Sequence, residues 1–266
     1  MRRGLAADTD EALRRIERGE VLVGGAPAAS AARLTDDGEA VRVLAPPAFV
    51  GRGGAKLDAA LADLGVVPAG RRALDVGSST GGFTDCLLQR GAAHVVAVDV
   101  GTHQLHERLR ADPRVQVEEQ TDIRSVSAAN LGGPFSLVVV DVSFVSLTAL
   151  MAQLASLVRP GGDLVVLVKP QFEVSHREAS RGRGVIRSPR LWAEAVTAVA
   201  HAARHVLLVP VGATVSAVRG AQGNVEFFVA LRAGLPADAA DALAVGWVGE
   251  LVATVAGPVE ERPDGA

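Results

Sequence analysis

Seven short apolar runs, separated by helical patterns, constrain the fold of this chain more than any other feature. They lie between Arg71 and Arg232 and read RRALDVG, AHVVAVDV, RVQVEEQ, FSLVVVDV, DLVVLVK, HVLLVPV and EFFVALR. Near-continuous apolar runs of this length are typical of strands buried on both faces. Strands that alternate with helices form mainly parallel sheets. We therefore predict an α/β fold, a doubly wound and mainly parallel seven-stranded sheet with helices on both faces.

The first 45 residues have a different pattern and predict a separate, small α+β domain. DTDEALRRIERG has apolar residues at helical spacing, and EVLVGGAPA and EAVRVL are short alternating segments around turn residues. Paired prolines favour extended backbone, so residues 46–50 are expected to form a linker. Residues 51–266 then form the larger domain, and a C-terminal helix is predicted after Leu235 that ends before Gly257.

Composition excludes several classes of protein. A single cysteine, Cys86, permits neither an intramolecular disulfide nor a thiolate metal cage, which favours a reducing compartment. No apolar run reaches the roughly 20 residues that span a bilayer, and the N-terminus has no apolar signal-peptide core. We therefore expect a cytoplasmic protein that does not contact membranes. The net charge of −3 gives no global basic footprint, so a nucleic-acid partner would have to be bound locally.

The clearest local basic cluster is the stretch QFEVSHREASRGRGVIRSPR. It contains Arg177, Arg181, Arg183, Arg187 and Arg190 against Glu173 and Glu178. One interpretation is a solvated, mobile loop followed by a helix that starts at Ser188-Pro189. The other is a loop that contacts phosphates. The sequence leaves both interpretations open.

A ligand site is predicted where the first strand of the large sheet ends. In LDVGSSTGGFTD, Asp75 ends the strand, a loop follows with Gly77, Ser79, Gly81 and Gly82, and a helix starts at Phe83. Glycines allow tight turns and close approach of another molecule. Ligands of doubly wound sheets bind beyond the carboxyl ends of the strands. The spacing is not G-x-G-x-x-G, so the dinucleotide pyrophosphate fingerprint is absent.

Two further acids follow the next two strands. Asp99 in AVDVG ends the second strand, where a carboxylate can accept hydrogen bonds from a ribose diol. Asp122 in QTDIR follows the third strand, where it could read an adenine edge. Taken singly, each acid is more simply a helix N-cap. Three acids at successive strand ends favour a nucleoside ligand without phosphates, which suits S-adenosylmethionine.

Four residues are candidates to act on a substrate. Asp141 ends the fourth strand and Lys169 the fifth, so both should project into one crevice. Lys169 closes a strongly apolar run and should be partly desolvated unless it is paired. Lys56 follows a Gly-Gly turn on the helix before the first strand, and Glu226 opens the last strand. Alone, these two are more simply a surface lysine and a strand-start glutamate.

These residues belong to six motifs that occur in order: RGGAKL, LDVGSSTGGFTD, AVDVG, DVSFVSL, LVKPQFE and GNVEFF. Together the motifs resemble the TlyA-type ribosomal RNA 2′-O-methyltransferases, relatives of the FtsJ-like RNA methyltransferases, and the resemblance runs from about Arg3 to Arg232. It implies a Rossmann-like class I methyltransferase fold that uses S-adenosylmethionine. It also implies an N-terminal S4 RNA-binding domain and methylation of a cytidine ribose in ribosomal RNA. The S4-like segment starts late in this sequence, so either the module is shortened or the start codon is misassigned.

The resemblance further implies that Lys56, Asp141, Lys169 and Glu226 form the Lys-Asp-Lys-Glu tetrad that serves the target ribose. Catalysis would be mostly alignment, because holding the reacting atoms in line can supply roughly 7–11 kcal/mol of the barrier. Lys169 would orient the hydroxyl and stabilise developing alkoxide charge, or accept the proton. Asp141 and Glu226 would position the two lysines, and Lys56 would clamp the ribose or an adjacent phosphate. No metal is needed for this chemistry.

The implied partner is ribosomal RNA or a ribosomal subunit. If the basic cluster is functional, Arg177, Arg181, Arg183 and Arg187 are its expected phosphate contacts. The first 50 residues contain seven basic and eight acidic residues, so the S4-like domain is expected to be a weak RNA clamp by itself. A non-catalytic RNA-binding protein on the same fold would be favoured by loss of a tetrad residue, and all four are present. A haemolysin finds no support in any strongly basic amphipathic segment. The paired lysines and the S4-like start argue against a small-molecule or protein methyltransferase.

Overall fold

The chain divides into two compact units, Met1–Ala48 and Phe49–Ala266. The computed structural model describes residues 3–17, 19–28, 30–36, 38–44, 48–235 and 246–256. Residues 46 and 47 of the predicted linker, and residues 236–245 of the predicted C-terminal helix, therefore lie outside the described residues. The two units are described separately.

The first unit contains one helix and a three-stranded antiparallel sheet of order β2-β1-β3. The elements are α1 (Thr9–Glu17), β1 (Val21–Val23), β2 (Ala26–Pro27) and β3 (Val41–Val43). Asp8 Oδ1 accepts a hydrogen bond from Glu11 N at 2.7 Å, and Glu11 Oε2 accepts one from Ala7 N at 2.7 Å. These two acids therefore cap the start of α1, where N–H groups have no partner within the helix.

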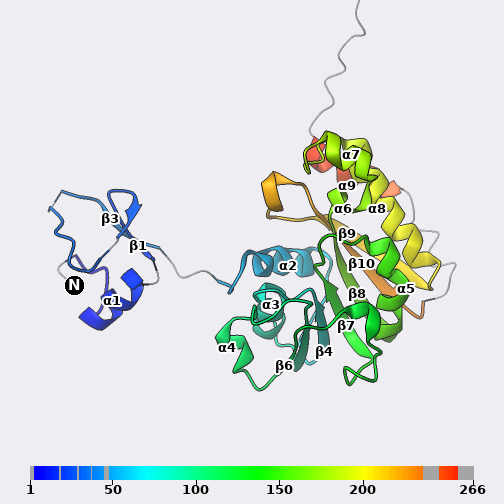
Figure 1. Cartoon of the computed structure of the whole chain (residues 1–266), viewed down its shortest axis with the longest axis horizontal. Coiled ribbons are helices and arrows are strands. Elements are labelled where there is room, and N and C mark those ends of the chain that lie inside the picture. Colours follow the sequence, from blue (N-terminus) through cyan, green and yellow to red (C-terminus); the bar gives the residue numbers. More distant parts are fainter. Residues whose placement is uncertain are drawn as a thin grey trace, which may run out of the picture. The chain divides into compact units, whose positions relative to one another are not determined.

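The second unit contains the predicted seven-stranded sheet (Figure 1). Its strands are β4 (Arg72–Val76), β5 (His94–Val98), β6 (Val115–Glu118), β7 (Phe135–Val140), β8 (Val158–Val168), β9 (Leu208–Val215) and β10 (Phe227–Ala233). The strand order is β6-β5-β4-β7-β8-β10-β9. The pairs from β6 to β8 are parallel, whereas β10 is antiparallel to both of its neighbours. The prediction of a doubly wound, mainly parallel sheet is confirmed.

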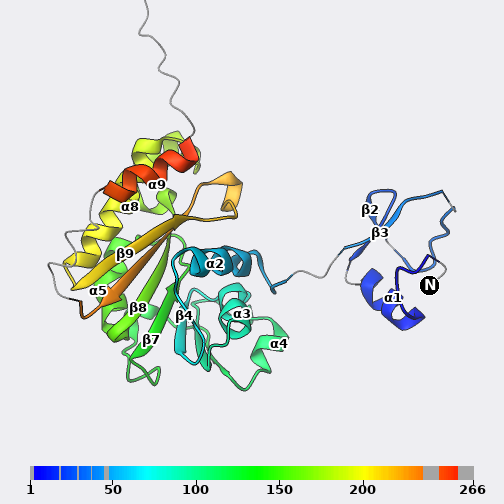
Figure 2. The ribbon, with the colours of Figure 1, turned by 180° about the vertical axis from the view of Figure 1, so that it is seen from behind.

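Helices cover both faces of this sheet (Figures 1 and 2). One face packs against α2 (Arg52–Asp63), α3 (Gly82–Gln89) and α4 (Glu107–Arg110), and the other against α5 (Leu147–Leu157), α8 (Pro189–Arg204) and α9 (Gly246–Ala256). Strand side chains alternate between the two cores: Leu137 and Val139 of β7 join the first, and Val138 and Val140 the second. Burial on both faces explains why the strands read as continuous apolar runs.

Two local predictions were wrong. The cluster of arginines is not a loop throughout, because α6 (Pro170–Glu173) and α7 (His176–Arg181) lie within it. Ser175 Oγ accepts a hydrogen bond from Glu178 N at 3.3 Å, so the Ser-His-Arg-Glu stretch acts as a cap that starts α7. The Gly53-Gly54 pair is not a turn before the helix but part of the first turn of α2. The helix predicted to start at Ser188-Pro189 is confirmed as α8, with Ser188 at its N-cap.

Candidate active site

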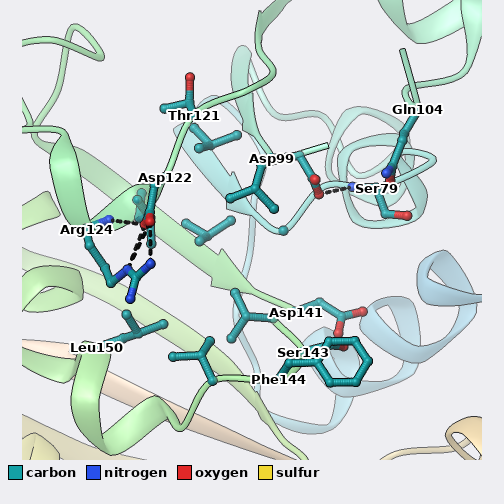
Figure 3. Close-up of a pocket in the computed structure, with 17 residues that line it drawn as sticks. Ser79, Asp99, Gln104, Thr121, Asp122, Arg124, Asp141, Ser143, Phe144 and Leu150 are labelled. Atoms are coloured by element: carbon teal, nitrogen blue, oxygen red, sulfur yellow. Dashed lines mark hydrogen bonds and ion pairs between the residues drawn. The ribbon is translucent and has the colours of Figure 1, made fainter. Parts of the chain in front are cut away.

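A cavity of about 610 Å³ opens at the carboxyl edge of the sheet, between the loops that follow β4, β5, β6 and β7. Figure 3 shows that polar side chains from these loops face it, among them the predicted cofactor residues Ser79, Asp99 and Asp122. Gly77 also lines the cavity, and Val98, Val100, Ile123 and Leu150 give it an apolar wall. An apolar pocket with a few convergent polar groups at the switch point of a doubly wound sheet is a typical small-ligand site.

Asp99 connects two of the loops that form this cavity. Its Oδ2 accepts a hydrogen bond from Ser79 N at 2.8 Å (Figure 3), and its Oδ1 accepts one from Gly101 N at 2.7 Å. A carboxylate has about four acceptor positions, so two of these remain for a ligand. The backbone bonds fix the orientation of the carboxylate before a ligand arrives.

Asp122 has the contacts of a helix N-cap. It starts the 3₁₀ turn η1 (Ile123–Ser125) by accepting a hydrogen bond from Arg124 N at 2.9 Å, and it pairs with the Arg124 guanidinium at 2.6 Å. That pairing lowers the pKa of the Asp122 carboxyl to about 2. Asp122 also lines the cavity (Figure 3), so its N-cap role and a ligand role are compatible.

Asp75 is fully buried, and its Oδ2 accepts a hydrogen bond from Thr84 Oγ1 at 2.7 Å. Desolvation by burial raises the pKa of this carboxyl to about 7. Asp75 and Gly81, both in the described part of the chain, lie outside the cavity. Asp75 is therefore linked to the glycine loop through Thr84 of α3, the helix that follows the loop.

The glycines of the loop accommodate the chain itself. A Cβ on Gly82 would lie 2.8 Å from Gly54 N, a Cβ on Gly81 would lie 2.8 Å from Leu105 Cδ1, and a Cβ on Gly77 would collide with Asp141 O. Gly77 and Gly81 also have φ values of +82° and +96°. These glycines allow α2, α3 and the loop after β7 to approach one another closely.

The four candidate substrate residues form two ion pairs. Lys56 Nζ lies 2.6 Å from Glu226 Oε2, and Lys169 Nζ lies 2.6 Å from Asp141 Oδ1. Both lysines are only 9% exposed. Asp141 and Lys169 follow parallel strands, and Glu226 precedes the antiparallel β10, so all three come to the same edge of the sheet.

A second, smaller cavity connects these pairs to the larger one. It measures about 200 Å³ and is lined by Lys56 together with Phe83, Gly82 and three residues that also line the larger cavity: Gly77, Ser79 and Asp141. Lys56 and Asp141, one member of each ion pair, thus face the same space. Lys169 and Glu226 line neither cavity and are connected to this space through their partners Asp141 and Lys56. A buried ammonium group at such a place can hold and polarise a hydroxyl or an anionic group.

Several polar and aromatic contacts around Lys169 were not predicted from the sequence. Ser143 Oγ accepts a hydrogen bond from Lys169 Nζ at 2.9 Å. Phe144 is 91% exposed, has a φ of +66° and lines the large cavity (Figure 3), with its ring centroid 5.1 Å from that of Phe172. Glu173 binds Ser146 Oγ at 2.6 Å and Leu147 N at 2.8 Å. The available sequence signal was the DVSFVS stretch, an aromatic residue flanked by serines directly after a buried strand.

The arginines of residues 171–190 differ in their partners. Arg190 pairs with Glu194 at 2.5 Å. Arg177, Arg181, Arg183 and Arg187 are exposed and form no ion pair with any described residue. Across the described ranges, no group of three or more His, Cys, Asp or Glu residues could hold a metal ion, and no helix there is long and apolar enough to cross a membrane.

Comparison with known proteins identifies the family. Residues 49–233 match the FtsJ-like methyltransferases. The 16S/23S rRNA (cytidine-2′-O)-methyltransferase TlyA of Mycobacterium tuberculosis is 45% identical over 234 residues, which cover 87% of each chain. The chain belongs to the TlyA group of FtsJ-like methyltransferases. Another member of this group, the 23S rRNA (cytidine-2′-O)-methyltransferase TlyA of Campylobacter jejuni, is 33% identical over 68% of this chain and 69% of its own length.

A solved structure agrees with this membership. A Lactococcus lactis protein described under the name hemolysin is 35% identical, superposes with a TM-score of 0.73, and covers 80% of this chain and all of its own. As a member of the TlyA group, the protein is a methyltransferase with S-adenosylmethionine as its cofactor. The large cavity fits that cofactor: it has an oriented carboxylate for a diol and an apolar wall for a base, and the arginine that lines it is already paired with Asp122.

Proposed function

We propose that this protein methylates the 2′-hydroxyl of a cytidine ribose in ribosomal RNA. The observation that carries the proposal is the presence of two buried lysine–carboxylate pairs beside the cofactor cavity, with Lys56 and Asp141 facing one space. The names of the Mycobacterium tuberculosis and Campylobacter jejuni relatives support the choice of substrate.

Lys169 is proposed to act on the hydroxyl. When bound, S-adenosylmethionine supplies an activated methyl group on a sulfonium. A ribose hydroxyl is a weak nucleophile, so the protein must orient it and stabilise the charge that develops on its oxygen. Asp141 forms an ion pair with the Lys169 ammonium and Ser143 accepts a hydrogen bond from it, so the ammonium is held in place while it has further N–H donors for the hydroxyl.

Lys56 and Glu226 form the second half of the proposed tetrad. Glu226 is 3% exposed and holds Lys56 at the wall of the smaller cavity. From there Lys56 is proposed to clamp the ribose or its neighbouring phosphate. Within the larger cavity, Asp99 is proposed to bind the cofactor ribose and Asp122 the adenine side, with Gly77 and Ser79 in its wall. Gly82 and Phe83 are proposed to complete the cofactor site from the smaller cavity that they line, with Asp75 and Gly81 supporting the loop.

RNA is proposed to bind across the rim of this site. The exposed Phe144 ring offers a surface on which a base can stack. Arg177, Arg181, Arg183 and Arg187 are proposed to contact phosphates, because their charges are exposed and unpaired within the described chain. Residues 1–45 are proposed to be an S4-like unit, residues 46–50 a linker, and the location to be the cytoplasm, where ribosomes are.

The test is to incubate the purified protein with methyl-labelled cofactor and, separately, small ribosomal subunits, large ribosomal subunits and protein-free ribosomal RNA. We expect label on one or more cytidine riboses, located by nucleotide mapping. Binding of subunits without label would favour the non-catalytic alternative. Label on protein or on a base would reject 2′-O-methylation.

A further inference from the structure

Asn224 belongs to the GNVEFF motif, yet the proposed chemistry does not use it. Its side chain is 3% exposed and lies against a segment some 40 positions earlier in the chain. Its Oδ1 accepts a hydrogen bond from Ile186 N at 3.0 Å, and its Nδ2 donates one to Gly184 O at 2.8 Å. A side-chain amide offers an acceptor and donors in one plane. Asn224 therefore holds the backbone of residues 184–186 in the way that a neighbouring strand would.

The backbone that Asn224 holds is the end of the arginine segment, which we define as residues 175–187. The segment turns sharply just before this contact, with φ values of +51° at Arg183 and +80° at Gly184. Trp192 Nε1 donates a hydrogen bond to Ile186 O at 2.9 Å. Both backbone polar groups of Ile186 are thus bound by buried side chains, which fixes the segment at its C-terminal end.

The same asparagine lies two residues before Glu226 of the proposed tetrad. Its backbone O accepts a hydrogen bond from Gly220 N at 2.9 Å, and Ser216 N donates one to Glu226 O at 2.9 Å. The loop between β9 and β10 is thereby closed around Glu226. Figure 1 shows this loop, with the η2 turn (Ala221–Gly223) in orange, at the same end of the sheet as α6 and α7.

We propose that Asn224 is a positioning residue that sets the place of the arginine segment relative to Glu226 and Lys56. The inference rests on the proposed RNA methylation. Phosphates held by Arg177, Arg181 and Arg183 would bring the target ribose to the tetrad only if the segment keeps a fixed distance from it. The buried amide of Asn224, which lies between the arginine segment and Glu226 in its contacts, supplies that constraint. The arginines do not supply it themselves, since they form no ion pair with described residues.

The test is a double-mutant cycle on the full chain, with Asn224→Ala, the double variant Arg181→Ala/Arg183→Ala, and the three changes combined. Affinity for ribosomal RNA is measured by filter binding, and single-turnover methyl transfer is measured against RNA concentration. We expect Asn224→Ala to raise the half-saturating RNA concentration about tenfold. The rate at saturating RNA should stay within about twofold of the parent, with unchanged cofactor affinity. In the combined variant, the Asn224 change should add little to the arginine changes, because both act through the same contacts.

The proposal would be overturned if the Asn224 and arginine changes had additive effects on RNA affinity. It would also be overturned if Asn224→Ala lowered the melting temperature but left RNA affinity unchanged. Asn130→Ala, an exposed asparagine before β7 at the other edge of the sheet, is the matched control and should leave RNA affinity unchanged. If Asn224→Ala does not fold, Asn224→Asp takes its place, because it keeps the acceptor for Ile186 N and loses the donor to Gly184 O. Filter binding needs no turnover, so absence of methyl transfer in the parent would reject the proposed function while the cycle still tests Asn224.

Discussion

Lys169 is the residue at which the proposed chemistry is most open to test. Its ammonium is held by Asp141 at 2.6 Å and Ser143 at 2.9 Å, so its position is set before substrate binds. A group of this kind acts mainly in the transition state. We expect Lys169→Ala to bind cofactor and RNA almost as well as the parent, with methyl transfer lower by about 10²- to 10⁴-fold in single-turnover kinetics.

Lys169→Arg separates this role from a structural one. A planar guanidinium cannot occupy the point between Asp141 and Ser143 that an ammonium fills, so we expect little recovery of activity. If Lys169 only supported packing with the aliphatic part of its side chain, Lys169→Arg would be nearly as active as the parent. Lys169→Ala would then have both a lower melting temperature and a lower activity. A stable Lys169→Ala protein with parental turnover would remove this residue from the mechanism.

Asp75 makes the stability of the fold depend on pH. Burial raises the pKa of its carboxyl from the ordinary 3.8 to about 7, so between these values the folded chain holds a proton that the unfolded chain has lost. The stabilising contribution is complete below the lower value and is lost as pH rises through the higher one, at up to about 1.4 kcal/mol per pH unit.

Asp75→Asn should therefore have a smaller loss of unfolding free energy from about pH 5 to about pH 8 than the parent, measured by urea denaturation. The amide does not titrate, and it keeps an oxygen that can accept from Thr84. Parallel curves for the two proteins would show that Asp75 titrates normally.

The sequence predicted the position of individual site residues better than their contacts. Strand ends identified Asp99, Asp141 and Lys169, because every parallel strand delivers its last residue to the same edge. The partners could not be predicted, since Lys56 and Glu226 are 170 positions apart and meet only because β10 runs antiparallel. Asp75 looked like its fellow strand-end acids, but it lies within β4, two positions before the level that Asp99 and Asp141 occupy beyond their strands, so its side chain is buried. The catalytic and cofactor roles of these residues stay predictions.

At the scale of elements, the close packing of α2 against α3 positions Lys56, a member of the second ion pair of the proposed tetrad. A Cβ on Gly82 would lie 2.8 Å from Gly54 N and 3.2 Å from Gly53 Cα, both backbone atoms that cannot rotate away. We expect Gly82→Ala to lose about 1–3 kcal/mol of stability. It should also lower methyl transfer, because α2 would move Lys56 away from the small cavity.

Gly53→Ala is the matched control for this prediction. Its Cβ would lie 3.2 Å from Phe83 Cδ1, which is a side-chain atom that can shift. Alanine also favours a helix over glycine by up to about 1 kcal/mol. Thermal unfolding and methyl transfer close to those of the parent are expected, and an equal defect in both variants would argue against the backbone clash.

Elements with a strong pattern were predictable and elements defined by a cap were not. All seven strands follow from their apolar runs, whereas the antiparallel direction of β10 depends on the connection through β9 and has no local signal. The helix α7 is six residues long and polar, so periodicity is weak and only the Ser175–Glu178 cap marks it. The glycines of the loop predicted the close approach of another molecule. The structure shows that atoms of the protein itself, in α2 and in the loop after β7, also approach these glycines closely.

For the molecule as a whole, the distribution of charged residues says more about RNA binding than the net charge does. The net charge is −3, and the first 50 residues have seven basic against eight acidic residues, so neither favours RNA. The acids Asp8 and Glu11 in this first unit are occupied in capping α1. The arginine segment, in contrast, contains four exposed arginines that form no ion pair with described residues: Arg177, Arg181, Arg183 and Arg187.

This distribution predicts how RNA binding responds to salt. Each arginine that contacts a phosphate releases a counterion, so affinity falls linearly with salt on logarithmic axes, with a slope of roughly 0.7 to 0.9 per contact. Arg181→Ala/Arg183→Ala should therefore reduce the slope by roughly two units at most. The matched control is Arg114→Ala/Arg159→Ala, which removes the same charge from residues beside the starts of β6 and β8, at the opposite edge of the sheet. We expect the control to keep the parental slope, because these positions are remote from the candidate site. Equal slopes for all three proteins would show instead that the arginine segment is a solvated surface without phosphate contacts.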